Sequence, residues 1–178
     1  IHDEVGIARV NLVSLQSVSG SGKAGIQELA RQTATLLNGR PAESQAYPSQ
    51  IAFNLLPQID EVTQSGYSLE EERLEQETRR LLGDERILVN ATCVRVPVFY
   101  GHSQVVHLET QHACELDELR RVLVEAPGVS LCDDELLTPV THGVGQSEVY
   151  ISRLRQDSTP PQGVNFFLVT DNLRKGGA

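Results

Sequence analysis

Two residues near the middle of the chain, Arg95 and His102, have side chains and a setting suited to chemistry. Arg95 stands inside the apolar, β-branched stretch that begins at Cys93, and His102 directly follows Gly101. A buried guanidinium is costly in free energy unless an anion meets it. A histidine beside a glycine, where the backbone allows close approach, can serve as an acid, a base or a ligand. This stretch is therefore a candidate site for anion binding and proton transfer.

A purely structural interpretation of the same residues stays open. In it Arg95 pairs with a structural carboxylate, and His102 caps a turn.

A second candidate pair lies at the start of a helix that the sequence predicts clearly. Ser68 and Glu71 have the spacing of a capping box, and the helix extends to Gly83. Glu70 and Arg73 fall on one face of its first turn. They either point together into a cleft or belong to the solvated charged face.

The loop of residues 19–25, rich in Gly and Ser, follows a predicted strand and precedes a predicted helix. Such a loop can present backbone N–H groups to an anion or to a cofactor amide. It matches neither the Gly-x-Gly-x-x-Gly fingerprint nor the P-loop spacing, so connection is its default role. Gln16, which precedes the loop, is by default an ordinary strand residue.

Composition limits the class of protein. The chain has 178 residues, of which 39% are hydrophobic and 22% charged, and this suits a single globular domain over residues 1–178. The net charge of −9 argues against a nucleic-acid-binding surface. No apolar run long enough for a membrane span and no signal-peptide pattern is found, so we expect a cytoplasmic protein. The three cysteines lack Cys-x-x-Cys spacing, so we expect reduced thiols and neither a metal site nor disulfides.

The hydrophobic periodicity predicts an α+β fold, a mixed, largely antiparallel sheet with helices packed on one face. Strands are expected over residues 9–18, 87–98, 104–110, 128–132, 148–155 and 164–169, and helices over residues 24–37, 68–83 and 115–125. Residues 50–59 are expected to be half strand and half turn, and residues 133–146 a loop. The inward face of the first helix is expected to hold Ile26, Leu29, Thr33, Leu36 and Leu37, and that of the second Leu69, Leu74, Leu81 and Leu82.

The uncovered face of the sheet is expected to be apolar. Val96, Val98, Phe166 and Leu168 are the residues expected there, and such a face would suit a dimer partner. The chain begins with Ile, contains no Met and ends in the run Arg174 to Ala178, so we interpret it as a piece of a longer protein.

Four blocks of sequence together resemble the C-terminal domain of the aspartate-semialdehyde dehydrogenase family, which has the fold of the glyceraldehyde-3-phosphate dehydrogenase C-terminal domain. The blocks are residues 14–23, 50–54, 90–103 and 171–176. The resemblance implies an enzyme that interconverts aspartyl 4-phosphate and aspartate 4-semialdehyde with NADP and phosphate, through a cysteine thioester. In the family that cysteine lies in an Asn-Cys-Ser/Thr block of an N-terminal Rossmann domain. None of Cys93, Cys114 and Cys132 stands in such a block, and we interpret Cys93 as a structural thiol.

The resemblance also assigns roles on the substrate side. Arg95 corresponds to the arginine that grips the substrate carboxylate, and Glu70 to the carboxylate that binds the substrate ammonium. His102 corresponds to the acid/base histidine, which takes the thiol proton and later handles the proton of the hemithioacetal oxygen. Gln16 corresponds to the substrate-orienting glutamine. Arg73 stands where the family has a phosphate-binding lysine.

On the cofactor side, Ser19 and Gly20 correspond to residues that line the nicotinamide, and Asn172 to one that contacts its amide. The same resemblance implies a homodimer or a homotetramer and contact with the protein's own N-terminal Rossmann domain.

Two alternatives stay open. N-acetyl-glutamyl-phosphate reductase has the same plan and thiol chemistry, but its acylated substrate does not need an ammonium-binding Glu70. A catalytically silent paralogue acting as a dimeric scaffold would be expected to lose Arg95 and His102, and both are present.

Overall fold

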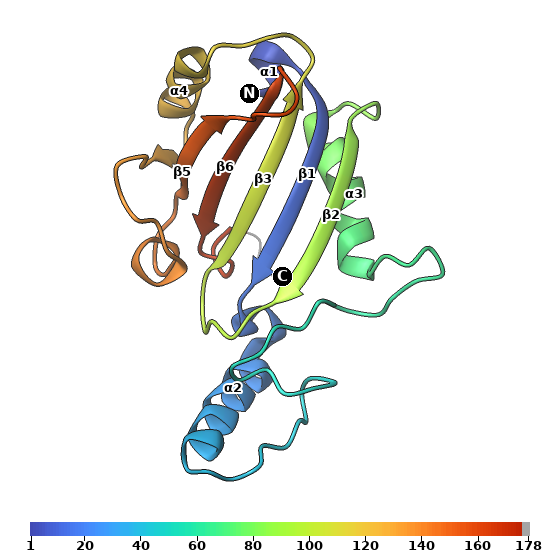
Figure 1. Cartoon of the computed structure of the whole chain (residues 1–178), viewed down its shortest axis with the longest axis vertical. Helices are drawn as coiled ribbons and strands as arrows, with labels where there is room; N and C mark the ends of the chain where they lie inside the picture. The colour runs from blue at the N-terminus through green and yellow to red at the C-terminus, as the bar shows by residue number, and fades with distance from the viewer. Residues whose placement is uncertain (176–178) are drawn as a thin grey trace.

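The computed structural model describes residues 1–175, so Gly176, the last residue of the fourth block, and the two residues after it lie outside the described part. One sheet forms the body, and helix α2 extends away from one end of it (Figure 1). The elements are α1 (His2–Val5), β1 (Ile7–Gln16), η1 (Val18–Ser21), α2 (Gly22–Leu37), α3 (Leu69–Leu82), β2 (Leu88–Arg95), β3 (His102–Thr110), α4 (Leu116–Glu125), β4 (Val129–Leu131), η2 (Pro139–Gly143), β5 (Val149–Gln156) and β6 (Gly163–Thr170).

The strands form one mixed sheet in the order β2-β1-β3-β6-β5-β4. β1 runs parallel to β2 and antiparallel to β3, and β6 runs antiparallel to both β3 and β5. The short β4 closes the sheet in parallel with β5. Antiparallel pairing therefore predominates, and the expected α+β class is confirmed.

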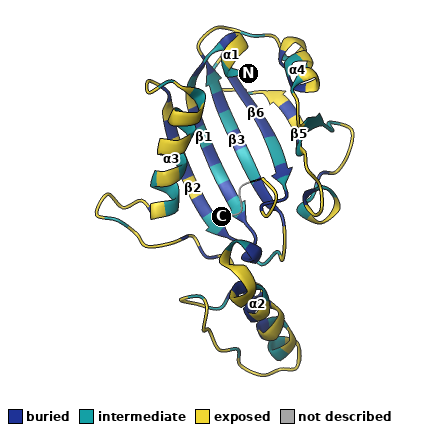
Figure 2. Cartoon of the chain, turned by 180° about the vertical axis from the view of Figure 1, so that it is seen from behind, coloured by how far each residue is buried: buried dark blue, intermediate teal, exposed yellow. Residues whose placement is uncertain are grey.

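Helices α3 and α4 pack on the same face of this sheet (Figure 2). The side chains of Leu119 and Leu123 from α4, with Leu74 and Leu82 from α3, contact the core that the strands provide. The capping box at the start of α3 is formed as predicted. The predicted stripe on α3 is only half inward, because Leu69 is 42% and Leu81 84% exposed.

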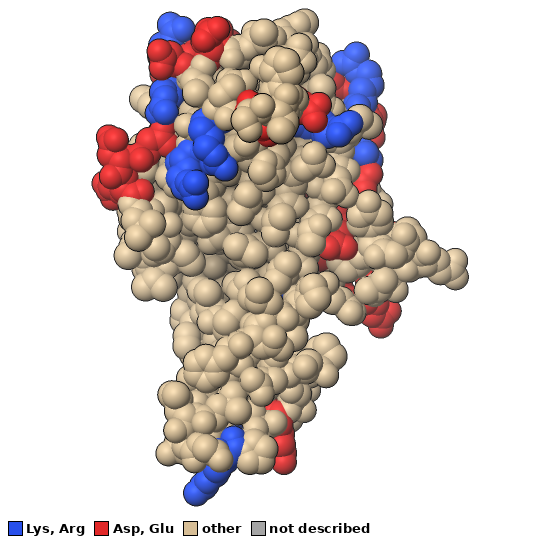
Figure 3. Space-filling view, viewed as in Figure 1, with Lys and Arg blue, Asp and Glu red and all other residues tan. Residues whose placement is uncertain are grey.

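Within residues 1–175, no helix lies on the opposite face of the sheet (Figure 1). Val13 lies beside Val105 in the strand register, Val105 lies beside Phe167, and all three are half-buried. Charged side chains gather around the rim of this view and leave the centre almost free (Figure 3). We call this surface the open face.

The assignment to the open face was wrong for three of the four predicted residues, Val96, Phe166 and Leu168. Phe166 is opposite Val106 in the register and is buried in the helix-covered core, and Val96 is also buried. Leu168 packs against the same core. The run of residues 164–169 is apolar at nearly every position, so it shows no alternation from which its inward side could be predicted.

Helix α2 packs against the loop that follows it. Its buried residues are Gly25, Glu28, Leu29 and Gln32, whereas the predicted inward residue Leu37 is 74% exposed. A second apolar cluster joins this helix to the loop, with Leu29, Ile51 and Leu56 among its members. The predicted inward face was right for Leu29, and the predicted Ile26 and Leu36 also pack against this cluster. It was wrong for Leu37 and left out the polar Glu28 and Gln32.

Two further predictions need correction. Residues 50–59 form no strand, and their only pairing is an isolated bridge between Leu56 and Arg95. The predicted loop of residues 133–146 contains the turn η2, which packs against Gly101 just before His102.

Within residues 1–175, no helix is long and apolar enough to cross a membrane. The same residues hold no group of three or more metal-ligating side chains.

Candidate active site

The site is built where the parallel strands β1 and β2 end together. Gln16 and Arg95, the last residues of these strands, are paired in the register, and both are buried. The Arg95 Nη1 donates a hydrogen bond to the carbonyl oxygen of Ser17 over 2.8 Å. No ion pair of Arg95 occurs within residues 1–175, so the structural-carboxylate alternative finds no support there. Burial lowers the pKa of Arg95 from its ordinary value, and a bound anion would offset that cost.

Glu70 connects the start of α3 to this strand pair. Its Oε1 accepts a hydrogen bond from Gln16 Nε2 over 2.9 Å, and its Oε2 lies 3.0 Å from Arg73 Nη1. The Glu70 side chain is 13% exposed, whereas that of Arg73 is 55% exposed and also lies 3.9 Å from Asp60. Gln16 Oε1 is buried without a partner in the described residues. The predicted Glu70 and Arg73 thus face the site together.

His102 begins β3 and is 8% exposed. The backbone N–H of Ser17 donates to His102 Nδ1 over 3.2 Å, and the Ser17 hydroxyl lies 3.2 Å from the same nitrogen. Nε2 is buried and has no partner among residues 1–175. Burial, followed by the charge of Arg95, lowers the pKa of His102 to about 4. The ring is therefore neutral near pH 7, and its unpartnered nitrogen is available to a ligand.

Gly20 brings the loop close to both functional side chains. A Cβ atom at this position would lie 2.7 Å from Arg95 Nη1 and 3.4 Å from His102 Cε1. A larger residue would displace the guanidinium, so the absence of a side chain is a geometric requirement here.

Asn172 ties together the loop and the turn before His102. Its Oδ1 accepts hydrogen bonds from Ser19 Oγ and from Gly101 N, each over 3.1 Å, while Nδ2 is buried without a partner in the described residues. The saturated oxygen fixes the orientation of the amide. Asn172 therefore presents a single free group, a donor.

Cys93 does not belong to this chemistry. Its side chain is fully buried on β2, and burial, followed by the nearby Glu70 and Glu71, raises the pKa of its thiol to about 12. A thiol of this kind is a poor nucleophile. This agrees with the interpretation of Cys93 as structural.

The structure brings all eight predicted site residues into one region, connected through Ser17, Gln16 and Asn172. Sequence reasoning missed Ser17, which contacts Arg95 through its carbonyl and His102 through its N–H. It also missed Tyr47 and Asp60, which line a cavity beside Arg95. The one signal for Ser17 in the sequence was its position between Gln16 and the loop of residues 19–25.

The fold and the site together define an α+β domain with a buried guanidinium, suited to an anionic ligand, beside a neutral, buried imidazole. A family model described as semialdehyde dehydrogenase, dimerisation domain, matches residues 1–175. The chain belongs to this family.

Several similar proteins are named aspartate-semialdehyde dehydrogenase. Over the whole chain, aspartate-semialdehyde dehydrogenase from Shewanella violacea is 51% identical, and the match covers 53% of that protein. The enzyme of the same name from Legionella pneumophila is 48% identical, with 52% of its length covered. Among solved structures, aspartate semialdehyde dehydrogenase II from Vibrio cholerae, complexed with ASA, superposes on this chain with a TM-score of 0.96. The two sequences are 46% identical. That structural match covers 98% of this chain and 52% of the other, so the chain spans about half the length of its relatives.

Proposed function

We propose that the chain is the substrate-binding and dimerisation domain of an NADP-dependent aspartate-semialdehyde dehydrogenase. The whole protein would interconvert aspartyl 4-phosphate and aspartate 4-semialdehyde through a cysteine thioester. The observation that carries the proposal is that Ser17 holds two buried side chains, Arg95 and His102, next to each other. Arg95 is a guanidinium without an ion-pair partner in residues 1–175, and His102 is an imidazole whose Nε2 is likewise without a partner there.

The substrate is an amino-acid zwitterion, and the site offers a group for each of its charges. Arg95 binds the carboxylate, because a planar guanidinium matches carboxylate geometry. Glu70 binds the ammonium and is held for this by Gln16 and Arg73. Arg73, on the more exposed side of Glu70, attracts the phosphate, and Gln16 Oε1 orients the substrate as an acceptor.

His102 handles the proton at the reacting carbonyl. Because Ser17 N–H donates to Nδ1, the neutral ring carries its proton on Nε2. To take up a proton on Nε2, the neutral ring must first shift its own proton to Nδ1, where Ser17 Oγ at 3.2 Å can accept that N–H in place of the bond from Ser17 N–H. Nε2 then takes the thiol proton, and the resulting imidazolium gives it to the thioester oxygen during reduction to the hemithioacetal. In the oxidative direction Nε2 takes the hemithioacetal proton and the ring becomes an imidazolium again.

The loop and Asn172 fit a nicotinamide. When bound, NADP accepts or supplies the hydride. The Asn172 Nδ2 is a buried donor without a partner in the described residues, which suits the oxygen of a carboxamide. Ser19 and Gly20 line the same place, and Gly20 leaves room for a ring beside Arg95 and His102.

The partners follow from the same proposal. Residues 1–178 form one domain of a longer cytoplasmic protein, whose N-terminal Rossmann domain supplies the nucleophilic cysteine and most of the cofactor site. The half-buried, weakly charged open face supports a homodimer, with a homotetramer as the larger possibility.

The test is an assay of the full-length protein for phosphate-dependent reduction of NADP, with aspartate semialdehyde and N-acetylglutamate semialdehyde compared. Turnover of aspartate semialdehyde alone is expected, because Glu70 is held in place for an ammonium. Turnover of the acylated substrate alone would assign the chain to the reductase. A soluble dimer that turns over neither would indicate the silent scaffold. This chain without its Rossmann domain is expected to be inactive.

A further inference from the structure

A cavity of about 250 Å³ opens beside Arg95. The segment after helix α2 supplies most of its wall, including Tyr47, Leu56 and Asp60. Leu56 is fixed against Arg95 by two backbone hydrogen bonds of 3.0 and 2.9 Å. The segment that lines the cavity is thus fixed to the backbone of the residue whose guanidinium the proposed function assigns to the substrate carboxylate.

Tyr47 lines this cavity, and its hydroxyl group is buried and has no hydrogen-bond partner within residues 1–175. The Tyr47 side chain packs against the apolar cluster of Val18, Leu29 and Ile51. Packing explains the aromatic ring, but a phenylalanine would pack equally well. A buried hydroxyl without a partner costs free energy, so the fold alone gives no reason for the oxygen atom.

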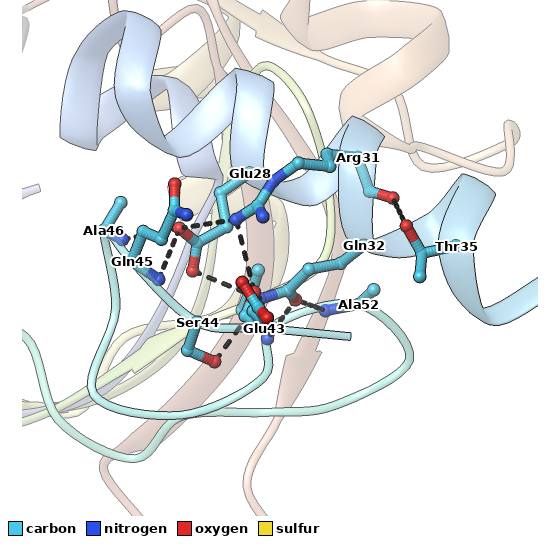
Figure 4. A network of polar contacts seen from close by, with 10 residues as sticks. Glu28, Arg31, Gln32, Thr35, Glu43, Ser44, Gln45, Ala46 and Ala52 are labelled. Carbon is cyan, nitrogen blue, oxygen red and sulfur yellow. Dashed lines mark hydrogen bonds and ion pairs between the residues drawn. The ribbon is translucent and has the colours of Figure 1, made fainter. Parts of the chain in front are cut away.

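Helix α2 holds the backbone on both sides of Tyr47 (Figure 4). The Glu28 carboxylate accepts the backbone N–H groups of Gln45 and Ala46 at 2.9 and 2.5 Å. One helical turn later, Gln32 Oε1 accepts those of Ile51 and Ala52 at 2.9 and 3.1 Å. The loop is thus clamped before and after the tyrosine.

Gly25, on the same helix, makes room for the hydroxyl. A Cβ atom there would lie 2.4 Å from the Tyr47 oxygen. Two buried polar side chains and one glycine of α2 together determine where this hydroxyl lies.

We propose that Tyr47 is a further substrate-binding residue, whose hydroxyl donates a hydrogen bond to the carboxylate held by Arg95. The inference rests on the proposed function, since it takes the ligand to be an amino acid with a free carboxylate. Two donors, Tyr47 and Arg95, then face the carboxylate. The carboxylates of Asp60 and Glu70, both of which approach Arg73, repel it and favour the ammonium on their side. The cavity therefore selects a free α-amino acid in one orientation.

The test compares Tyr47→Phe with a matched control in the full-length protein. Tyr67→Phe is the control, because the Tyr67 hydroxyl is bonded to Asn90 Oδ1 over 3.1 Å and the residue is 40% exposed. Tyr47→Phe should raise KM for aspartate semialdehyde about tenfold, as expected for one lost hydrogen bond to a charged group, with a smaller effect on kcat. KM for phosphate and NADP should stay within about twofold of wild type. Equal KM values for the two variants would overturn the proposal.

A substrate that lacks the carboxylate distinguishes a contact to that group from a general effect on the site. With 3-aminopropanal, which keeps the aldehyde and the amine, the two variants should have the same kcat/KM within about twofold. A loss that persists with this aldehyde would contradict the assignment to the carboxylate. The midpoint of thermal unfolding should not fall in Tyr47→Phe, because no hydrogen bond within residues 1–175 is removed. A fall would indicate a structural role instead.

Failure of the proposed function gives a separate result. If wild-type protein does not turn over aspartate semialdehyde, binding of L-aspartate by calorimetry still tests the cavity. Tyr47→Phe should weaken that binding about tenfold, and Tyr67→Phe should not. Equal affinities in all three proteins, or no binding of L-aspartate to wild type, would overturn the inference.

Discussion

The backbone N–H of Ser17 donates a hydrogen bond to Nδ1 of His102 over 3.2 Å. Because the donor is a backbone amide, Nδ1 accepts with its lone pair in the free protein, and the neutral ring there carries its proton on Nε2. The same residue, Ser17, binds Arg95 through its carbonyl oxygen. One buried residue thus fixes both the guanidinium and the imidazole.

The first prediction concerns the protonation of His102. Burial and Arg95 lower the pKa of His102 to about 4, so the ring should stay neutral at every pH above about 5. Nitrogen NMR of the free protein should show the Nε2–H tautomer at pH 7, and no change of its charge between pH 8 and about 5. A titration midpoint near 6.5, the ordinary value, would contradict the structure.

The second prediction is a pH dependence of stability. In the unfolded chain His102 has its ordinary pKa of 6.5, and in the folded chain about 4, so between these values the unfolded state binds more protons. The contribution of the neutral ring to stability is fully present above pH 6.5 and is lost as pH falls toward 4. At its full extent the loss amounts to about 3 kcal/mol of unfolding free energy.

Urea unfolding at pH 7.5 and 4.5 measures this loss. His102→Asn should lose less stability than wild type between the two pH values. His112→Asn, at an exposed histidine, should behave like wild type. Identical losses in wild type and His102→Asn would show that the ring does not titrate as described.

Local signals in the sequence predicted the parts of the fold that depend on near neighbours. The capping box of Ser68 and Glu71 is such a signal, and so are the strands on either side of Gly101. The prediction for the inward face of α2 left out Glu28 and Gln32, because their partners are distant in the sequence. The partners of Glu28 are the backbone amides of Gln45 and Ala46. Because these contacts do not involve the side chains of Gln45 and Ala46, the sequence does not indicate them.

In the candidate site too, residues with a local sequence signal were predicted, whereas contacts between distant segments were not. Arg95 and His102 stood out because a charged and a titratable group interrupt an apolar stretch. Gln16, Ser19 and Asn172 were found only through the family resemblance. Ser17 contacts Arg95 through its backbone carbonyl and His102 through its backbone N–H as well as its hydroxyl. The two backbone contacts do not depend on the residue type, so little in the sequence indicated them.

The third prediction concerns the thiols. Cys93 is fully buried and the pKa of its thiol is raised to about 12, whereas Cys114 and Cys132 are half-buried. In the folded protein an aromatic disulfide reagent should modify Cys114 and Cys132 slowly, because burial also raises the pKa of these thiols, and should leave Cys93 intact. Mass spectrometry of the digested protein identifies the labelled residues. Labelling of Cys93 ahead of the other two would contradict its structural role.

The fourth prediction tests the clamp between α2 and the loop before Tyr47. Glu28→Ala leaves two backbone N–H groups of the loop without their acceptor, in a place where Glu28 is only 3% exposed. Unfolding free energy should fall by about 2–4 kcal/mol, as for other losses of a buried, charged hydrogen-bonding group. The loop should also become accessible to proteases, because its attachment to the helix is weakened.

The matched control for this clamp is Glu43→Ala, since Glu43 is exposed and contributes only its backbone carbonyl to the same network. Its unfolding free energy should stay within about 0.5 kcal/mol of wild type. Urea titration gives both values, and limited proteolysis reports on the loop. If both variants were as stable as wild type, the Glu28 contacts would contribute nothing measurable to holding Tyr47. Position 47 would then have to be fixed by the packing of its ring against Val18 and Leu29 alone.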